Sequence, residues 1–239
     1  MQIRTNIANS TNFRKGRNGN RIKYIVMHYT ANDGDTAQNN ADFFRNEKGL
    51  NASAHYFVDE YGIYHSVLDE DTAWHCGGVL ESSHHPYKGI CMNVNSIGVE
   101  ICSRKNYNSG HYYFKQEAIN NAIELVKYLM KCYSIPVENV IRHYDVTGKN
   151  CPEPWVYDSK QFESFKQALI KKEEKPVTYE EWKAFQARYE KEKANEKASD
   201  YAKDSVVKAV KHGISDGSAP KANCTREQVL TMLDRAGVL

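Results

Sequence analysis

The segment RIKYIVMHYT, residues 21–30, decides the fold of the N-terminal part of this chain. Its middle is apolar and β-branched on both faces, which is typical of a strand buried in the centre of a sheet. Two similar stretches, 53–67 and 96–102, predict more strands, the first of them a pair that turns at 60–62. A further strand is expected at 140–142.

Helical patterns alternate with these strands. Asp35 or Thr36 can cap a helix that carries alanine and phenylalanine, and residues 116–133 repeat apolar side chains at helical spacing. A third helix is expected over residues 162–169, after a loop at 143–155. The alternation predicts an α/β domain with a mixed central β-sheet flanked by helices.

Composition excludes several classes of protein. The formal net charge of +2 over 239 residues provides no basic field for nucleic acid. No stretch approaches the roughly 20 apolar residues of a membrane span, and the first twenty residues lack the apolar core of a secretion signal. The six cysteines are scattered without a CxxC pair, so most are expected to be reduced and buried.

The character of the chain changes near residue 171, where a charged stretch begins. We expect a catalytic domain over 1–172, a charged helical linker over 173–198 and a small all-α module over 199–239. Thr178 with Glu181 forms a capping box for the linker helix. The helix carries an aromatic stripe of Trp182, Phe185 and Tyr189. Either the helix is a solvated connector, or the stripe packs on the first domain or on another chain.

Three residues have the chemistry of a zinc site. His28 ends the first strand, and His143 and Cys151 lie eight positions apart in a segment that contains Gly148 and Pro152. Zinc hydrolases typically hold the metal with three protein ligands and leave one position for water. Spacing alone leaves an alternative open, in which His28 is a packed or hydrogen-bonded strand residue.

Five segments resemble a known family, in the order in which that family carries them. They are IVMHYTA at 25–31, SAHYFVDEYG at 53–62, TAWHCGG at 72–78, NVNSIGVEI at 93–101 and RHYDVTGKNCP at 142–152. Over residues 21 to about 157 the chain resembles the type-2 N-acetylmuramoyl-L-alanine amidases. This family is related to animal peptidoglycan recognition proteins and is found in many phage endolysins.

The resemblance implies a zinc-dependent amidase that cuts the bond between N-acetylmuramic acid and L-alanine in bacterial peptidoglycan. It implies that His28, His143 and Cys151 hold Zn²⁺. It also implies that Glu100 is the general base and that Lys149 stabilises the oxyanion. Without the resemblance, Glu100 would be a solvated strand residue and Lys149 a solvated loop lysine.

The resemblance implies that a substrate groove is lined by Trp74, His75 and Asn93. Some relatives use a catalytic tyrosine in the second strand, where Ala54 stands here, so the base function falls to Glu100. A peptidoglycan recognition protein without hydrolytic activity is the alternative function. A closed structural zinc site is a third interpretation, for which only His55 and His75 offer a fourth ligand.

The tail, residues 199–239, resembles one S-layer-homology repeat through DSVVKAVKHGISDGS and TREQVLTMLDRAG. Such a module implies binding to a secondary cell-wall polymer, formation of a homo-oligomer, or both. The alternative is a small helical cap without a ligand. The whole pattern predicts an antimicrobial phage or prophage endolysin that is made in the host cytoplasm and reaches the wall without a signal peptide.

Overall fold

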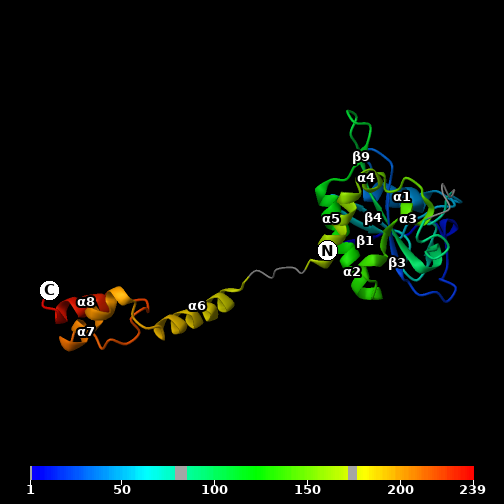
Figure 1. Cartoon of the computed structure of the whole chain (residues 1–239). Coiled ribbons are helices and arrows are strands. Elements are labelled where there is room, and N and C mark those ends of the chain that lie inside the picture. Colours follow the sequence, from blue (N-terminus) through cyan, green and yellow to red (C-terminus); the bar gives the residue numbers. More distant parts are fainter. Residues whose placement is uncertain (1, 79–84, 172–176) are drawn as a thin grey trace. The chain divides into compact units, whose positions relative to one another are not determined.

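The computed structural model describes residues 2–78, 85–171 and 177–239 (Figure 1). The chain divides into two compact units, Met1–Lys172 and Glu173–Leu239. The helix that follows the charged stretch clusters with the second unit. In the described part of the chain, no helix has both the length and the apolar character needed to cross a membrane.

A mixed six-stranded sheet forms the centre of the first unit, as the sequence predicts. Its strands, in spatial order, are β1 (Ile3–Thr5), β5 (Gly62–His65), β4 (Tyr56–Asp59), β7 (Ser96–Ile101), β3 (Tyr24–Tyr29) and β10 (Val140–Arg142). The β4–β5 pair is antiparallel, and the other neighbours pair in parallel. The predicted first strand is therefore a central strand, with β7 on one side and β10 on the other.

The two faces of the sheet are covered by different helices. The predicted helices are present as α1 (Ala37–Asn46), α2 (Gln116–Tyr133) and α5 (Ser159–Ile170). Ile25 and Met27 of β3 share the largest core with α2, α5 and Trp155. Successive side chains of a strand point to opposite faces, so Val26 and His28 face the other side. On that side, α1 packs against Phe57 of β4.

Thr36, and not Asp35, caps α1. Its hydroxyl accepts the N–H of Asn39 at 3.1 Å, and the Asn39 side chain accepts the N–H of Thr36. Asp35 instead accepts a hydrogen bond from the Asn40 amide at 2.6 Å. The carboxylate of Asp35 is thereby held at the start of α1, on the side that carries His28.

The segment 143–155, expected to be a loop, contains two short helices. They are α3 (His143–Thr147) and α4 (Glu153–Tyr157). The Asp145 carboxylate accepts the backbone N–H of Arg142 at 2.8 Å and pairs with its guanidinium at 2.7 Å, which starts α3. Gly148, at φ 80°, ends it in the left-handed conformation. The prediction of a loop at 143–155 is wrong. The start of α3 depends on the ion pair between Asp145 and Arg142, which the sequence pattern alone does not show.

Two small antiparallel ladders lie outside the main sheet, and the sequence analysis missed both. They pair β2 (Phe13–Arg14) with β6 (Thr72–Ala73), and β8 (Arg104–Lys105) with β9 (Tyr112–Tyr113). Short 3₁₀ helices cover Ser10–Asn12, Asn93–Asn95, Val137–Asn139 and Asp200–Ala202. The β8–β9 hairpin projects from the first unit (Figure 1).

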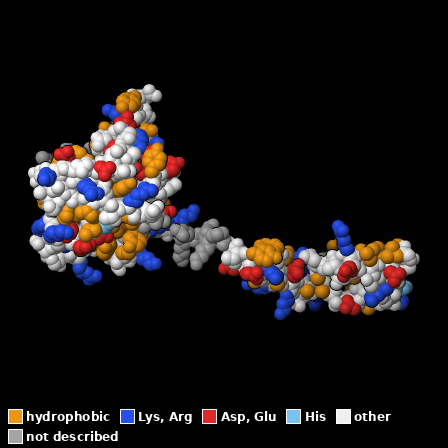
Figure 2. Space-filling view, turned by 180° about the vertical axis from the view of Figure 1, so that it is seen from behind, with side chains coloured by type: hydrophobic (Ala, Val, Ile, Leu, Met, Phe, Trp, Pro, Cys, Tyr) orange, Lys and Arg blue, Asp and Glu red, His pale blue; other side chains and the backbone are white. Residues whose placement is uncertain are grey.

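The second unit is helical. It contains α6 (Tyr179–Ala194), α7 (Lys203–Lys211) and α8 (Arg226–Arg235). Both predicted capping boxes are confirmed: Thr178 accepts the N–H of Glu181, and Thr225 accepts that of Gln228. No residue of these three helices is buried, and apolar side chains are visible on the surface of the unit (Figure 2).

Candidate active site

A cleft of about 620 Å³ opens where β3 and β7 end, on the face that carries α1. His28 of β3, Glu100 of β7, and His143, Lys149 and Cys151 of the segment after β10 all line it. Parallel strands bring their carboxyl ends to the same edge of a sheet, and α/β proteins bind ligands at such edges. The topology therefore gathers residues that lie up to 123 positions apart.

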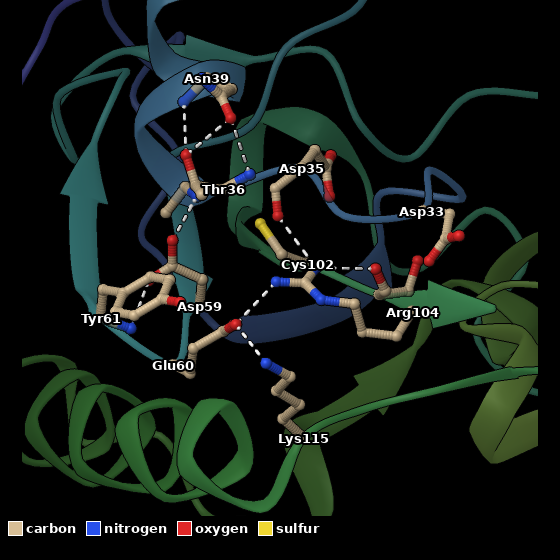
Figure 3. A network of polar contacts seen from close by, with 12 residues as sticks. Asp33, Asp35, Thr36, Asn39, Asp59, Glu60, Tyr61, Cys102, Arg104 and Lys115 are labelled. Atoms are coloured by element: carbon tan, nitrogen blue, oxygen red, sulfur yellow. Dashed lines mark hydrogen bonds and ion pairs between the residues drawn. The ribbon is translucent and has the colours of Figure 1, made fainter. Parts of the chain in front are cut away.

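One wall of the cleft is held by a polar network (Figure 3). Arg104 and Lys115 both pair with the Glu60 carboxylate, at 2.7 and 2.8 Å. Arg104 also donates to the carbonyl of Asp35 at 2.9 Å. Asp59 accepts the backbone N–H of Ala37 at 2.7 Å. These contacts fix the start of α1, and with it the cleft wall.

The structure brings together the three residues expected to hold a metal. Ligand atoms of His28, His143 and Cys151 all lie within 4.8 Å of one another, and all three residues are buried. His28 Nδ1 lies 3.6 Å from Cys151 Sγ, and the His28 and His143 ring centroids are 4.8 Å apart. Two imidazoles and one thiol are a donor set that zinc accepts.

His143 provides a test of whether these residues fit a metal. Both of its ring nitrogens are buried, and neither has a hydrogen-bond partner among the described residues. A buried polar group without a partner costs about 1–3 kcal/mol, so such groups are rare unless a ligand completes them. The orphaned imidazole therefore fits a site built around an ion.

The protonation of the two histidines also suits a metal. Burial, with His143 nearby, lowers the pKa of His28 well below its usual range. Burial lowers the pKa of His143 to about 4. Both rings are thus neutral near pH 7 and have a lone pair available. Burial raises the pKa of the Cys151 thiol to about 12, so metal binding would have to displace its proton.

Glu100 lies beside His28 in the cleft. Its Oε1 is 4.0 Å from His28 Nδ1, and its Oε2 is buried without a partner in the described part of the chain. Burial raises the pKa of this carboxyl to about 8; Lys149 opposes the rise and Asp35 adds to it. Glu100 is therefore not an ordinary solvated strand residue.

Lys149 brings a positive charge to the same place. It lies in the turn between α3 and Cys151, and its side chain lines the cleft. The charge is close enough to lower the pKa of both His28 and Glu100. A cation fixed at this edge can stabilise a negative charge that develops in the cleft.

The three residues expected in a substrate groove have different positions. Trp74 lines the cleft. His75 touches the cleft but is 7% exposed, with its Nδ1 3.1 Å from His28 Nε2. Asn93 lies at an adjoining hollow of about 240 Å³ together with Trp74. The Asn93 side-chain oxygen accepts the backbone N–H groups of His75 and Cys76, at 2.9 and 2.7 Å.

Comparison with known proteins decides the family. A sequence profile of the N-acetylmuramoyl-L-alanine amidases matches residues 18–154, which include every candidate site residue. The chain belongs to the N-acetylmuramoyl-L-alanine amidase family. The sequence resemblance to this family is thereby confirmed, whereas the comparisons do not extend it to the S-layer-homology module.

Curated relatives in this family include proteins of Bacillus. A probable N-acetylmuramoyl-L-alanine amidase of Bacillus licheniformis is 36% identical over 155 residues, which are 62% of this chain and 41% of that protein. The amidase BlyA of Bacillus subtilis is 34% identical over 153 residues, 61% of this chain and 40% of its own length. The chain thus spans about two fifths of the length of these relatives.

Solved structures of amidase-family members share the fold. PlyL superposes with a TM-score of 0.56 at 30% identity, over 72% of this chain and 98% of that one. A mutant endolysin from Bacillus subtilis gives 0.55 at 29% identity, over 71% and 99%. This agreement confirms the predicted α/β class, with its mixed sheet between helices.

The sequence analysis missed Asp35 as a cleft residue of this amidase-family chain. Asp35 accepts hydrogen bonds from Thr30 at 3.2 Å and from Asn40, and its charge acts on Glu100. As a polar residue before a helix, it looked like a cap. Its position among the cleft residues depends on tertiary packing, which brings Arg104 of β8 to the carbonyl of Asp35.

Proposed function

We propose that this chain hydrolyses the amide bond between N-acetylmuramic acid and L-alanine in bacterial peptidoglycan, with zinc held by His28, His143 and Cys151. One observation carries the proposal: three metal-binding side chains converge within 4.8 Å at the floor of an open cleft, with Glu100 beside them. The printed names of the Bacillus relatives, which are N-acetylmuramoyl-L-alanine amidases, support the choice of bond.

A zinc ion bound there would polarise the scissile carbonyl and make a bound water a better nucleophile. Glu100 takes the proton of the attacking water and passes it to the leaving amine. With a pKa of about 8 the Glu100 carboxyl is mostly protonated near pH 7, and the charge of a bound zinc ion would favour the ionised carboxylate, which is the form that can accept this proton. Lys149 stabilises the negative charge that develops on the carbonyl oxygen. Trp74 offers an apolar face in the cleft against which substrate can pack.

Among the described residues, the group that could hold a metal consists of three side chains, which supports a catalytic site. A structural zinc site would be closed by four protein ligands. The two candidates for a fourth ligand, His55 and His75, have other partners. His55 Nδ1 accepts the N–H of Gly98, and His75 Nδ1 lies 3.1 Å from His28 Nε2. A zinc ion held by three protein ligands would keep one position for water.

We also propose a role for each part of the second unit. Residues 173–198 would act as a helical linker, and residues 199–239 as a module that binds a cell-wall polymer or a second copy. The exposed apolar side chains of α7 and α8, which include Val207, Val210 and Leu230, support the role of this module in binding. As a phage or prophage endolysin, the protein would act on the wall after release from the host cytoplasm. The solved endolysin of the same fold supports this role.

The test is an incubation of the purified protein with peptidoglycan, with and without a metal chelator, followed by an assay of new chain ends. We expect new alanine amino groups and no new reducing sugars, with activity lost in chelator and restored by zinc. New reducing ends would identify a glycosidase. Retention of peptidoglycan without new ends would identify a recognition protein instead of an enzyme.

A further inference from the structure

Behind the candidate zinc site, a chain of buried hydrogen bonds leads away from His28. His28 Nε2 lies 3.1 Å from His75 Nδ1, and His75 Nε2 lies 3.2 Å from the hydroxyl of Ser96. Ser96 in turn donates to the backbone carbonyl of Met92 at 2.7 Å. The chain lies on the side of His28 that faces away from Cys151.

The last contact sets the direction of all the others. A carbonyl only accepts, so the single hydrogen of the Ser96 hydroxyl goes to Met92. Towards His75 the Ser96 oxygen then acts as acceptor, which places the His75 hydrogen on Nε2. A neutral imidazole has one N–H, so His75 Nδ1 accepts and His28 Nε2 donates. His28 Nδ1 is left with a free lone pair, on the side of Cys151.

The neighbouring thiol is consistent with this direction. Cys76 Sγ lies 3.4 Å from His75 Nδ1 and 3.4 Å from the Ser96 oxygen. The lone pair of His75 Nδ1 is taken by His28, so the Cys76 thiol would donate to the second lone pair of the Ser96 oxygen. Asn93 holds the backbone of His75 and Cys76 in place, so its side chain supports the chain of hydrogen bonds.

Gly98 provides the space that His75 occupies. A Cβ at this position of β7 would lie 2.6 Å from His75 Cγ and 2.8 Å from its Nδ1. On another side, the His55 ring meets the His75 ring edge-on, with centroids 5.5 Å apart. The imidazole of His75 is thus confined in one position by a residue without a side chain and by a second ring.

The structure assigns to His75 and Ser96 the role of positioning residues that hold His28 in the tautomer whose Nδ1 faces the metal. This inference rests on the proposed zinc site. It gives His75 a role in addition to the substrate binding expected from the sequence, which stays a prediction. A hydrogen bond from the outer nitrogen of a ligating histidine fixes its ring and tautomer, and losing such a partner typically weakens metal binding about 10- to 100-fold.

A first experiment observes the tautomers directly. Histidine side-chain ¹⁵N spectra of the metal-free full chain near pH 7 should show protonated Nε2 and bare Nδ1 for both His28 and His75. A protonated Nδ1 on His28 would overturn the inference. This measurement is independent of hydrolytic activity.

A second experiment measures zinc affinity by competition with a chromophoric chelator. His75→Phe removes the acceptor and should weaken binding about 10- to 100-fold. His75→Asn keeps an oxygen near the position of Nδ1 and should recover most of the affinity. Unchanged affinity in a His75→Phe protein that has the parent's circular dichroism spectrum would overturn the inference.

Two further variants keep the inference testable if His75→Phe does not fold. Ser96→Ala should allow protonated Nδ1 to appear on His75 and should weaken zinc binding, whereas Ser96→Thr keeps the hydroxyl and should not. Gly98→Ala should displace His75 and weaken binding without removing any hydrogen-bonding group. If Ser96→Ala alters neither the tautomer nor the affinity, the inference fails.

Zinc binding and peptidoglycan cleavage by the parent chain distinguish a failure of this inference from a failure of the proposed function. A parent protein that binds no zinc overturns both. A parent that binds zinc and cleaves peptidoglycan, with variants that bind zinc equally well, overturns the positioning role alone.

Discussion

His28 and Glu100 are direct partners in the parallel pairing of β3 with β7. Because paired residues point to the same face of a sheet, this register places Glu100 Oε1 4.0 Å from His28 Nδ1. A shift of the pairing by one residue would send one of the two side chains to the opposite face. The backbone pairing of the central strands thus holds the proposed base against a proposed metal ligand.

Glu100→Gln should lower the rate of amide hydrolysis about 10²- to 10⁴-fold, because the amide cannot take the proton of the attacking water. Zinc content should be unchanged, since the glutamine keeps the size of the side chain. The rate of appearance of alanine amino groups measures the effect. Glu117→Gln, on the exposed face of α2, is the matched control and should hydrolyse at the parent rate.

Lys149→Ala should lower kcat about 10²-fold, because a charge near the developing oxyanion is lost. Lys149→Arg should retain part of the activity, since it keeps the charge with a different shape. Lys160→Ala removes an exposed lysine of α5 and serves as control. Equal kcat values for Lys149→Ala and the control would exclude Lys149 from the chemistry.

Zinc should stabilise the first unit against heat. A ligand present at 100 times its Kd adds about 2.7 kcal/mol to the free energy of unfolding. Calorimetry with and without zinc should therefore show a higher Tm in zinc. In Cys151→Ser the shift should shrink strongly, because the thiol donor is replaced by a hydroxyl that binds zinc poorly. A zinc-dependent shift of the same size in this variant would argue against Cys151 as a ligand.

Asp69→Asn should destabilise the fold by about 2 kcal/mol, away from the candidate site. The Asp69 carboxylate accepts hydrogen bonds from Tyr133 at 2.7 Å and Tyr56 at 2.9 Å, and it pairs with His65 at 3.3 Å. Burial would raise the pKa of Asp69, but the contacts with His65, Tyr133 and Tyr56 outweigh it, and the pKa is lowered. Denaturant unfolding at pH 7 measures the loss.

The lowered pKa of Asp69 also gives a pH dependence. A carboxyl whose pKa is lower in the folded than in the unfolded state adds stability above its ordinary pKa of about 3.9. That contribution disappears as the pH falls through the lower, folded-state value. The stability difference between the parent and Asp69→Asn should therefore be full at pH 6 and shrink in acid. A difference that grows in acid would contradict this assignment.

A chain that ends at Lys172 should fold and keep its zinc affinity. All residues of the largest core lie in the first unit, from Ile25 to Leu169, so the truncation removes no core side chain. Hydrolysis of small soluble muropeptides should be retained. If the second unit binds wall polymer, sedimentation with intact cell walls should decrease in the truncated chain. Equal sedimentation of both chains would remove that role from the second unit.

The sequence by itself determined the elements whose signals are local. The apolar run of β3, the helical repeat of α2 and the capping boxes at Thr178 and Thr225 depend on residues a few positions apart. The family motifs at 25–31 and 142–152 likewise contain His28, His143 and Cys151. Each of these signals is complete within a short stretch of the chain.

The tertiary structure alone decided how these parts meet. The strand β2 has two residues and exists because it pairs with β6, more than fifty positions away. The position of His75 behind His28 depends on the register of β7 and on the missing side chain of Gly98. Burial and nearby charges, which raise the pKa of Glu100, also come from distant segments. Such properties depend on which segments pack together, and local residue patterns do not encode that packing.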